Sequence, residues 1–135
     1  MRDHADTDEI QIRALLESWA DAVRRHDLPA ILAHHERDML MFDLVPPLQS
    51  QGIEAYEQSW GLLFRYHKPG TAFGFRELAI TTGVDAAFAA AIMWCGPDSS
   101  VSAADTDGFL FRLTVGLRKV GGNCRITHQH HSVPT

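Results

Sequence analysis

Residues 108–133 read GFLFRLTVGLRKVGGNCRITHQHHSV, and this stretch decides the fold class. Apolar and polar residues alternate on both sides of a glycine pair, Gly121–Gly122, which is typical of two strands joined by a tight turn. Two further segments upstream have the same strand-like character. The second half of the chain therefore predicts four antiparallel strands, at roughly 72–82, 84–95, 108–119 and 124–133.

Helical periodicity occupies the first half of the chain. Apolar residues between Glu9 and His26 recur at the spacing of one buried helix face. A short second helix is expected over about 29–36 and a third over 52–67, with a strand candidate at 39–43 between them. Helices gathered before strands indicate an α+β fold. We expect three N-terminal helices packed on a curved antiparallel β-sheet, in a single domain spanning residues 1–135.

Composition argues against several classes of function. The formal net charge of −5 disfavours a nucleic-acid partner. No apolar run approaches the roughly 18 residues of a membrane span, and the first ten residues lack the apolar core of a signal peptide. We therefore expect no membrane partner and a cytoplasmic location. No phosphate-binding glycine loop or serine elbow occurs, so no cofactor is suggested.

The cluster ITHQHHSV at residues 126–133 carries three histidines in four positions. Strict alternation places His128 and His130 on one face of the strand with Ile126, and His131 on the opposite face. If Gly121–Gly122 form a two-residue turn, Val115 faces His128 across the hairpin. His128 and His130 would then lie on the apolar inner face of the sheet.

Three interpretations of this histidine pair stay open. The two imidazoles could line a cavity as ligand contacts or proton carriers. They could instead be structural groups that hydrogen-bond the last strand to a loop or helix. A metal site is the third interpretation, but zinc takes three or four protein ligands and Asp43 is the one obvious third candidate. We therefore expect no metal.

The order of the elements resembles the nuclear transport factor 2-like superfamily, in particular its SnoaL-like and ketosteroid-isomerase-like members. Three stretches carry the resemblance: a helix running from Trp19 to Asp27–Leu28, the strand DMLMFD at 38–43 followed by a proline-containing loop and Gly52, and RITHQHHS at 125–132. The resemblance implies a cone-shaped α+β fold and a homodimer formed through the sheet.

The resemblance also implies a candidate base. Ketosteroid isomerases carry their general base at the position that matches Asp43, so we expect Asp43 to be catalytic, with His128 or His130 as its partner. Trp19, and Val115 or alternatively Thr114, stand where those isomerases have the Tyr and Asp side chains that donate hydrogen bonds to the substrate oxygen. Because neither Trp nor Val offers an O–H donor, steroid isomerisation is disfavoured. The alternative for Asp43 is an ordinary strand-end residue that hydrogen-bonds the backbone of the loop.

Five large side chains are candidates for contact with a small hydrophobic molecule. They fall on apolar stripes and could wall a cavity, although packing in a solid core is the competing interpretation. These residues are Trp19, Met41, Tyr56, Trp60 and Trp94.

Three functions compete at this point. The first is a cofactor-free isomerase, cyclase or dehydratase that acts by proton transfer. The second is a non-catalytic binding module, with a cavity of roughly 300 Å³ or more. The third is a dimeric assembly module whose interface lies on the polar face of the last strands, at Arg112, Thr114, Gln129 and His131.

Overall fold

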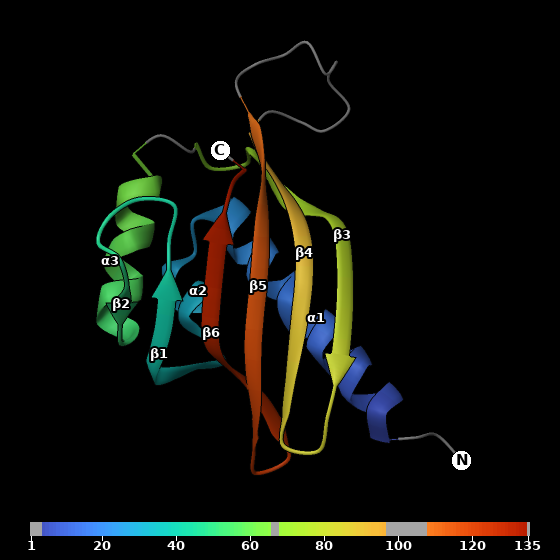
Figure 1. The fold of residues 1–135 in the computed structure, drawn as a ribbon. Helices are drawn as coiled ribbons and strands as arrows, with labels where there is room; N and C mark the ends of the chain where they lie inside the picture. Colours follow the sequence, from blue (N-terminus) through green and yellow to red (C-terminus); the bar gives the residue numbers. More distant parts are fainter. Residues whose placement is uncertain (1–3, 66–67, 97–107, 135) are drawn as a thin grey trace.

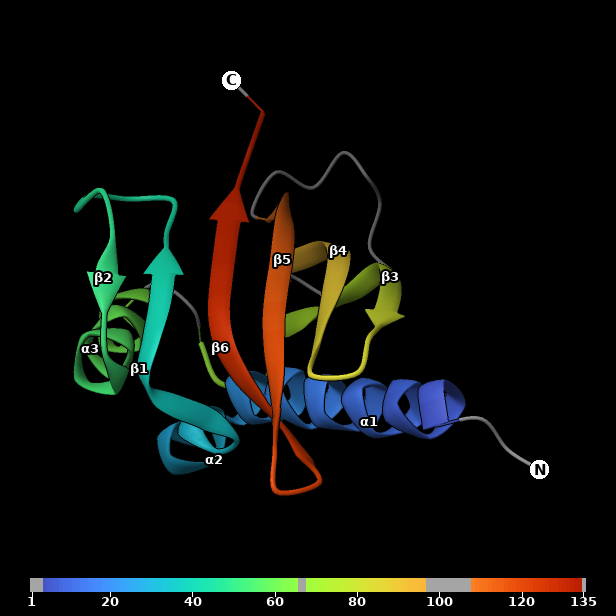
Figure 2. The ribbon, with the colours of Figure 1, turned by 60° about the horizontal axis from the view of Figure 1, so that its bottom comes forward.

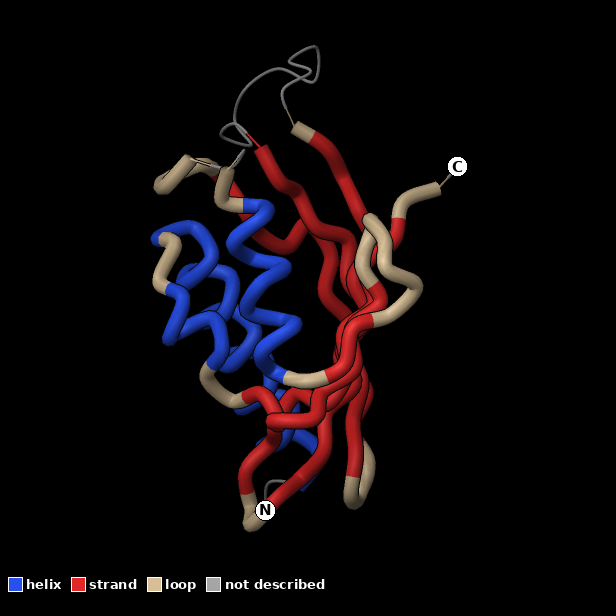
Figure 3. The backbone as a smooth tube through the Cα atoms, turned by 90° about the vertical axis from the view of Figure 1, so that its left-hand side faces the viewer, coloured by secondary structure: helices blue, strands red, loops and turns tan. Residues whose placement is uncertain are grey.

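Three helices lie on one face of a six-stranded sheet (Figure 3). The computed structural model describes residues 4–65, 68–96 and 108–134. The helices are α1 (His4–Arg25), α2 (Leu28–Leu32) and α3 (Ile53–Leu63). The strands are β1 (His35–Phe42), β2 (Ser50–Gln51), β3 (Ala72–Thr82), β4 (Ala86–Gly96), β5 (Phe109–Val120) and β6 (Asn123–Ser132). The α+β prediction, with three helices before the main strands, is confirmed.

The sheet has the strand order β2-β1-β6-β5-β4-β3 (Figure 1). Neighbours along it are antiparallel except for β1 and β6, which run parallel, so the sheet is mixed. A parallel pair needs a long crossover connection, and here most of the chain, including α3, lies between β1 and β6. The first strand of the sequence and the last are thereby brought side by side.

Helix α1 crosses the sheet and supplies much of the core (Figure 2). Its apolar face is buried at Ile12, Leu16, Trp19 and Val23, as the helical spacing predicts. The inner face of the sheet meets it with buried side chains at alternate positions of the strands. Full burial of one large apolar side chain stabilises a fold by about 1.5–3 kcal/mol, so this layer holds the sheet against the helix.

The second helix is shorter than predicted, and β1 begins earlier. Asp27 caps α2 by accepting a hydrogen bond from the backbone N–H of Ala30, at 3.2 Å. The helix ends at Leu32, and His34 then adopts a left-handed conformation with φ of 64°. This turn sends the chain into β1 at His35, so the predicted helix over 29–36 is wrong at its end. The third helix, predicted over 52–67, ends at Leu63, so its predicted end is also wrong, and residues 66–67 lie outside the described residues.

The hairpin between β5 and β6 contains a β-bulge that decides which histidines face inward. The turn is confirmed, with φ of 58° at Gly121 and 84° at Gly122. Leu117 pairs with Ile126 as expected, but Gly116 pairs with His128, which leaves Thr127 as an extra residue. A bulge of this kind shifts the side-chain alternation by one position.

Beyond the bulge the two faces of β6 are exchanged relative to the prediction. Gln129 and His131 are buried on the inner face, with 0% and 7% of their surfaces exposed. His128 and His130 lie on the outer face, paired with Gly116 and Thr114. The prediction that His128 and His130 share the apolar face with Ile126 is therefore wrong.

Cys95 and Cys124 are both free and buried. Within residues 4–65, 68–96 and 108–134, every helix is too short or too polar to cross a membrane.

Candidate functional site

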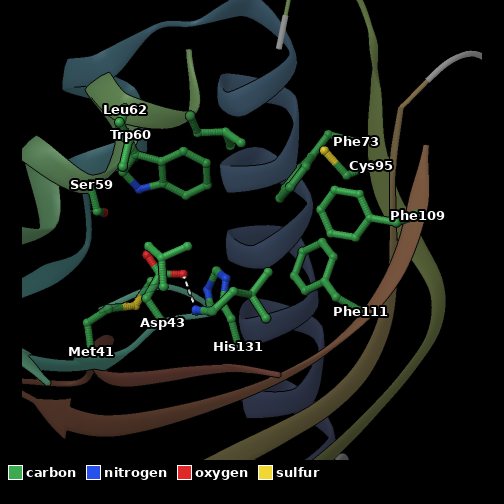
Figure 4. Close-up of a pocket in the computed structure, with 13 residues that line it drawn as sticks. Met41, Asp43, Ser59, Trp60, Leu62, Phe73, Cys95, Phe109, Phe111 and His131 are labelled. Carbon is green, nitrogen blue, oxygen red and sulfur yellow. Dashed lines mark hydrogen bonds between the residues drawn. The ribbon is translucent and has the colours of Figure 1, made fainter. Parts of the chain in front are cut away.

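A pocket of about 200 Å³ opens between α3, the end of β1 and the inner face of the sheet (Figure 4). Its walls are mostly apolar, with Trp60 and Leu63 from α3 and Phe73, Phe109 and Phe111 from the strands. The polar side chains that line it are Asp43, Ser59 and His131, and among the described lining residues none is Lys or Arg. The pocket therefore suits a small molecule that is largely apolar and carries no negative charge.

Asp43 projects into this pocket directly after β1. Alternation along the strand places it on the same face as Met39 and Met41, which are buried. The carboxylate is half-buried, and its Oδ1 accepts a hydrogen bond from the backbone N–H of Leu44 at 2.7 Å (Figure 4). One oxygen of Asp43 thus caps the loop, as expected of a strand-end residue, while the side chain also lines the cavity.

His131 is the imidazole that lines the pocket, and strict alternation missed it. Its ring stacks on Phe111, with centroids 5.5 Å apart and an interplanar angle of 22°. Burial lowers the pKa of His131 well below its usual value, although the charge of Asp43 acts in the opposite direction. The side chain is therefore a neutral imidazole at physiological pH, able to exchange hydrogen bonds with a ligand.

His128 and His130 are not brought together with Asp43 in the pocket. The Nδ1 atom of His128 lies 2.8 Å from the backbone carbonyl oxygen of Leu40 in the neighbouring strand β1, and it donates a hydrogen bond to that oxygen. The ring of Phe42 forms T-shaped contacts with both imidazoles, at centroid distances of 4.9 and 5.2 Å. His128 thus ties the last strand to β1, and His130 is exposed.

Trp19 and Tyr56 lie behind the pocket rather than in its wall. Both are buried, and the Trp19 indole N–H donates to the Tyr56 hydroxyl at 3.0 Å. The side-chain amide of Gln129 donates to the same hydroxyl at 2.9 Å. Burial raises the pKa of Tyr56 far above its usual value, so the phenol stays protonated.

Trp60 lines the pocket and carries a buried polar atom without a partner. Among the described residues, nothing accepts a hydrogen bond from its Nε1–H. The Tyr56 hydroxyl is near, but its two lone pairs are already occupied by Trp19 and Gln129. A buried donor without an acceptor costs about 1–3 kcal/mol.

Met41 and Trp94, the other two predicted ligand contacts, lie on opposite faces of the sheet. Met41 lines the pocket. Trp94 alternates with the buried Met93 and Cys95 and lies on the outer face, where its ring contacts the guanidinium of Arg76 at 5.2 Å. Cys95 itself lines the pocket, and burial raises the pKa of its thiol to about 11, so it forms part of the apolar wall.

Metal binding has no support in the part of the chain that is described. Over residues 4–65, 68–96 and 108–134, no three or more His, Cys, Asp or Glu side chains come together in a way that could hold an ion.

The fold and the pocket define a protein of the NTF2-like class, and the comparisons with known proteins specify the family. A SnoaL-like domain family matches residues 12–135. The chain therefore belongs to the SnoaL-like family. A search of curated proteins finds no match.

Solved structures agree with this assignment. An NTF2-like protein of unknown function from Pseudomonas putida KT2440 is 32% identical, with 96% of this chain and 89% of that chain covered and a TM-score of 0.84. Two more distant structures share the fold. One, from Streptomyces avermitilis, has a provisional description as a dehydratase of the NTF2-like family, with 16% identity, coverage of 96% and 99%, and a TM-score of 0.76. The other is a ketosteroid isomerase-like protein from Erwinia carotovora atroseptica, with 18% identity, coverage of 93% and 96%, and a TM-score of 0.70.

Proposed function

We propose that the pocket binds a small, neutral, largely apolar molecule with an oxygen function and catalyses a cofactor-independent proton transfer on it. The observation that carries the proposal is the combination of a carboxylate, Asp43, with an unpartnered N–H donor, Trp60, in one apolar cavity. Structural neighbours described as a provisional dehydratase and as ketosteroid isomerase-like support the reaction class.

The chemistry begins at a C–H bond next to a carbonyl group. The Asp43 carboxylate takes the proton, and the electron pair of the C–H bond moves into the carbonyl to form an enolate. Trp60 Nε1–H donates to the enolate oxygen, where negative charge develops. The proton on Asp43 then returns to a different carbon in an isomerisation, or to a β-hydroxyl group that leaves as water in a dehydration. Atoms and charge balance in both cases without a co-reactant.

His131 replaces His128 and His130 as the candidate partner of Asp43. It lines the pocket together with Asp43 and Trp60, whereas the other two imidazoles lie on the outer face. Because His131 is held neutral, it suits a hydrogen bond to a substrate hydroxyl better than it suits the supply of a positive charge.

The pocket volume limits the size of the ligand. About 200 Å³ is smaller than the roughly 300–1,000 Å³ of ligand sites for drug-sized molecules. The absence of Lys and Arg among the described lining residues removes the usual partners of carboxylate and phosphate groups. Monocyclic and small bicyclic ketones and enones fit these limits best.

Binding to a matched set of ligands tests this proposal. Thermal unfolding would be measured with a small bicyclic ketone such as 2-tetralone, and with a carboxylate and an amine of similar size. We expect a saturable rise in Tm with the ketone that is weakened in Trp60→Phe, which keeps an aromatic side chain but loses the N–H, and retained in His130→Gln. Preferential binding of the carboxylate would contradict the proposal.

A homodimer formed through the outer face of the sheet is a second proposal. This face carries Phe88 and Leu110, with 50% and 52% of their surfaces exposed, and the half-buried Ile92. It contains Arg112 and Thr114, as the assembly hypothesis expects, but Gln129 and His131 are turned inward and cannot contribute. Light scattering tests the dimer: we expect twice the chain mass for the wild type and a monomer for Leu110→Asp, whereas a monomeric wild type at micromolar concentration would contradict it.

A further inference from the structure

Three buried polar side chains form a continuous chain from the backbone of Ala33 to His131 in the pocket wall. The Nδ1 atom of His35 lies 3.0 Å from the carbonyl oxygen of Ala33. The other ring nitrogen, Nε2, lies 2.9 Å from Nε2 of Gln129. Oε1 of Gln129 lies 3.0 Å from Nε2 of His131. Each contact joins one donor to one acceptor, so the direction of the first hydrogen bond determines all the others.

The first hydrogen bond fixes the tautomer of His35. A carbonyl oxygen can only accept, so the hydrogen must lie on Nδ1 of His35. Burial lowers the pKa of His35 to about 4, so the ring is neutral and has a single N–H. Its Nε2 atom therefore presents a lone pair to Gln129.

The lone pair of His35 in turn fixes the orientation of the Gln129 amide. Only the NH₂ group of Gln129 can face an unprotonated nitrogen, and its second hydrogen reaches the Tyr56 hydroxyl at 2.9 Å. The amide oxygen is left to face His131. The reverse orientation would place the oxygen against the lone pair of His35, and a buried pair of acceptors without a hydrogen between them is destabilising.

We propose that His35 and Gln129 act as positioning residues that hold His131 in its Nε2–H tautomer. The remaining ring nitrogen, Nδ1, then carries the lone pair. A ligand that hydrogen-bonds to His131 must do so as a donor, for example through a hydroxyl group. This role toward a ligand rests on the proposed function, whereas the tautomer itself does not.

The chain predicts opposite tautomers for two buried histidines of one protein. His35 carries its hydrogen on Nδ1, the position less favoured in a free histidine side chain in water, and His131 carries it on Nε2. Both states can be measured directly, because the ¹⁵N chemical shifts of the two ring nitrogens distinguish Nδ1–H, Nε2–H and imidazolium forms. A purely structural contribution to packing would not select one tautomer.

The experiment is a long-range ¹H–¹⁵N correlation spectrum of the ¹⁵N-histidine-labelled full chain at pH 7, with His131→Gln and His35→Phe assigning the two rings. We expect His35 as Nδ1–H and His131 as Nε2–H. In Gln129→Met the acceptor for His131 is removed, so we expect its signals to shift toward a mixture of tautomers. In His130→Gln, on the opposite face of the same strand, both rings should be unchanged.

Two results would overturn the inference. One is an Nδ1–H tautomer of His131 in the wild type, and the other is an unchanged Nε2–H tautomer in Gln129→Met. If Gln129→Met does not fold, His35→Phe replaces it, because the loss of the lone pair frees the Gln129 amide to rotate and should again mix the tautomers of His131. Failure of ketone binding while both tautomers are as expected would reject the proposed function and leave this inference intact.

Discussion

Ile126 and His128 lie two residues apart in β6 and on opposite faces of the sheet. Ile126 pairs with Leu117 and is fully buried, whereas His128 pairs with Gly116 on the outer face. The bulge at Thr127 produces this exchange and aims Gln129 and His131 into the core. The polar chain behind the pocket therefore depends on one extra residue in one strand.

The exchange of faces predicts different chemical reactivity for the histidines of β6. His130 is exposed, whereas His131 has 7% of its surface exposed. Diethyl pyrocarbonate should modify His130 and the exposed His34 quickly, and His131 slowly. Peptide mass spectrometry after a short treatment measures each site. Equal rates at His130 and His131 would contradict the placement of the bulge.

The hydroxyl of Tyr56 should contribute strongly to stability. Tyr56→Phe leaves two buried donors, Trp19 Nε1–H and the Gln129 amide, without their acceptor. Each unsatisfied group costs about 1–3 kcal/mol, so we expect the free energy of unfolding in urea to fall by about 2 kcal/mol or more.

The matched control for Tyr56→Phe is a double-mutant cycle with Trp19→Phe. The second substitution removes one of the stranded donors, so the combined loss should be smaller than the sum of the two single losses. Strict additivity would show that the Trp19–Tyr56 hydrogen bond is not formed.

Stability should fall as the pH is lowered from 7 toward 5. Burial lowers the pKa of His35 from 6.5 to about 4 and also lowers the pKa of His131. Between pH 6.5 and 4 the unfolded chain therefore binds more protons than the folded chain, so acid favours unfolding. Each imidazole contributes a slope that approaches about 1.4 kcal/mol per pH unit.

Urea unfolding at pH 7 and pH 5.5 measures this pH dependence. His130→Gln should keep most of the difference between the two pH values, because both buried imidazoles remain. His131→Phe should reduce the difference. A wild type that is equally stable at both pH values would show that the two buried imidazoles are not held neutral.

Asp43→Asn should separate the two interpretations of this residue. Asparagine keeps an oxygen that can accept the hydrogen bond from the Leu44 N–H, so the stability should change by less than about 0.5 kcal/mol. Asp43→Ala loses that bond and should be less stable by about 1 kcal/mol. Thermal and urea unfolding of the two variants provide the comparison. A large loss in Asp43→Asn would mean that the negative charge itself supports the loop.

Much of the fold could be predicted from the spacing of apolar residues, because that spacing reflects which side chains are buried. The stripe from Ile12 to Val23 marked α1, and the alternation from Phe109 to Leu117 marked β5. The glycine pair at 121–122 marked the turn, since both residues need positive φ. The parallel pairing of β1 with β6 could not be predicted in this way, because alternation does not identify the neighbour of a strand.

The candidate site was predicted in part, and the limit is physical. Asp43, Met41 and Trp60 follow the alternation of β1 and the stripe of α3 into the pocket. His131 was missed because a single bulge residue reverses every face beyond it, and Thr127 resembles any other strand residue. The other cavity side chains, such as Phe73 and Phe109, depend on how the strands meet α3, which no local pattern encodes.

Exchange of the protons next to the carbonyl of 2-tetralone in D₂O tests the central claim most directly. The claim is that Asp43 removes a proton from a carbonyl compound held in the apolar pocket, and ¹H NMR follows the exchange with and without the protein. We expect a protein-dependent rate that saturates with ketone concentration and falls by about 10²-fold or more in Asp43→Asn, with His130→Gln as active as the wild type. A rate that is unchanged by Asp43→Asn, or exchange no faster than in buffer with the ketone bound, would contradict the account.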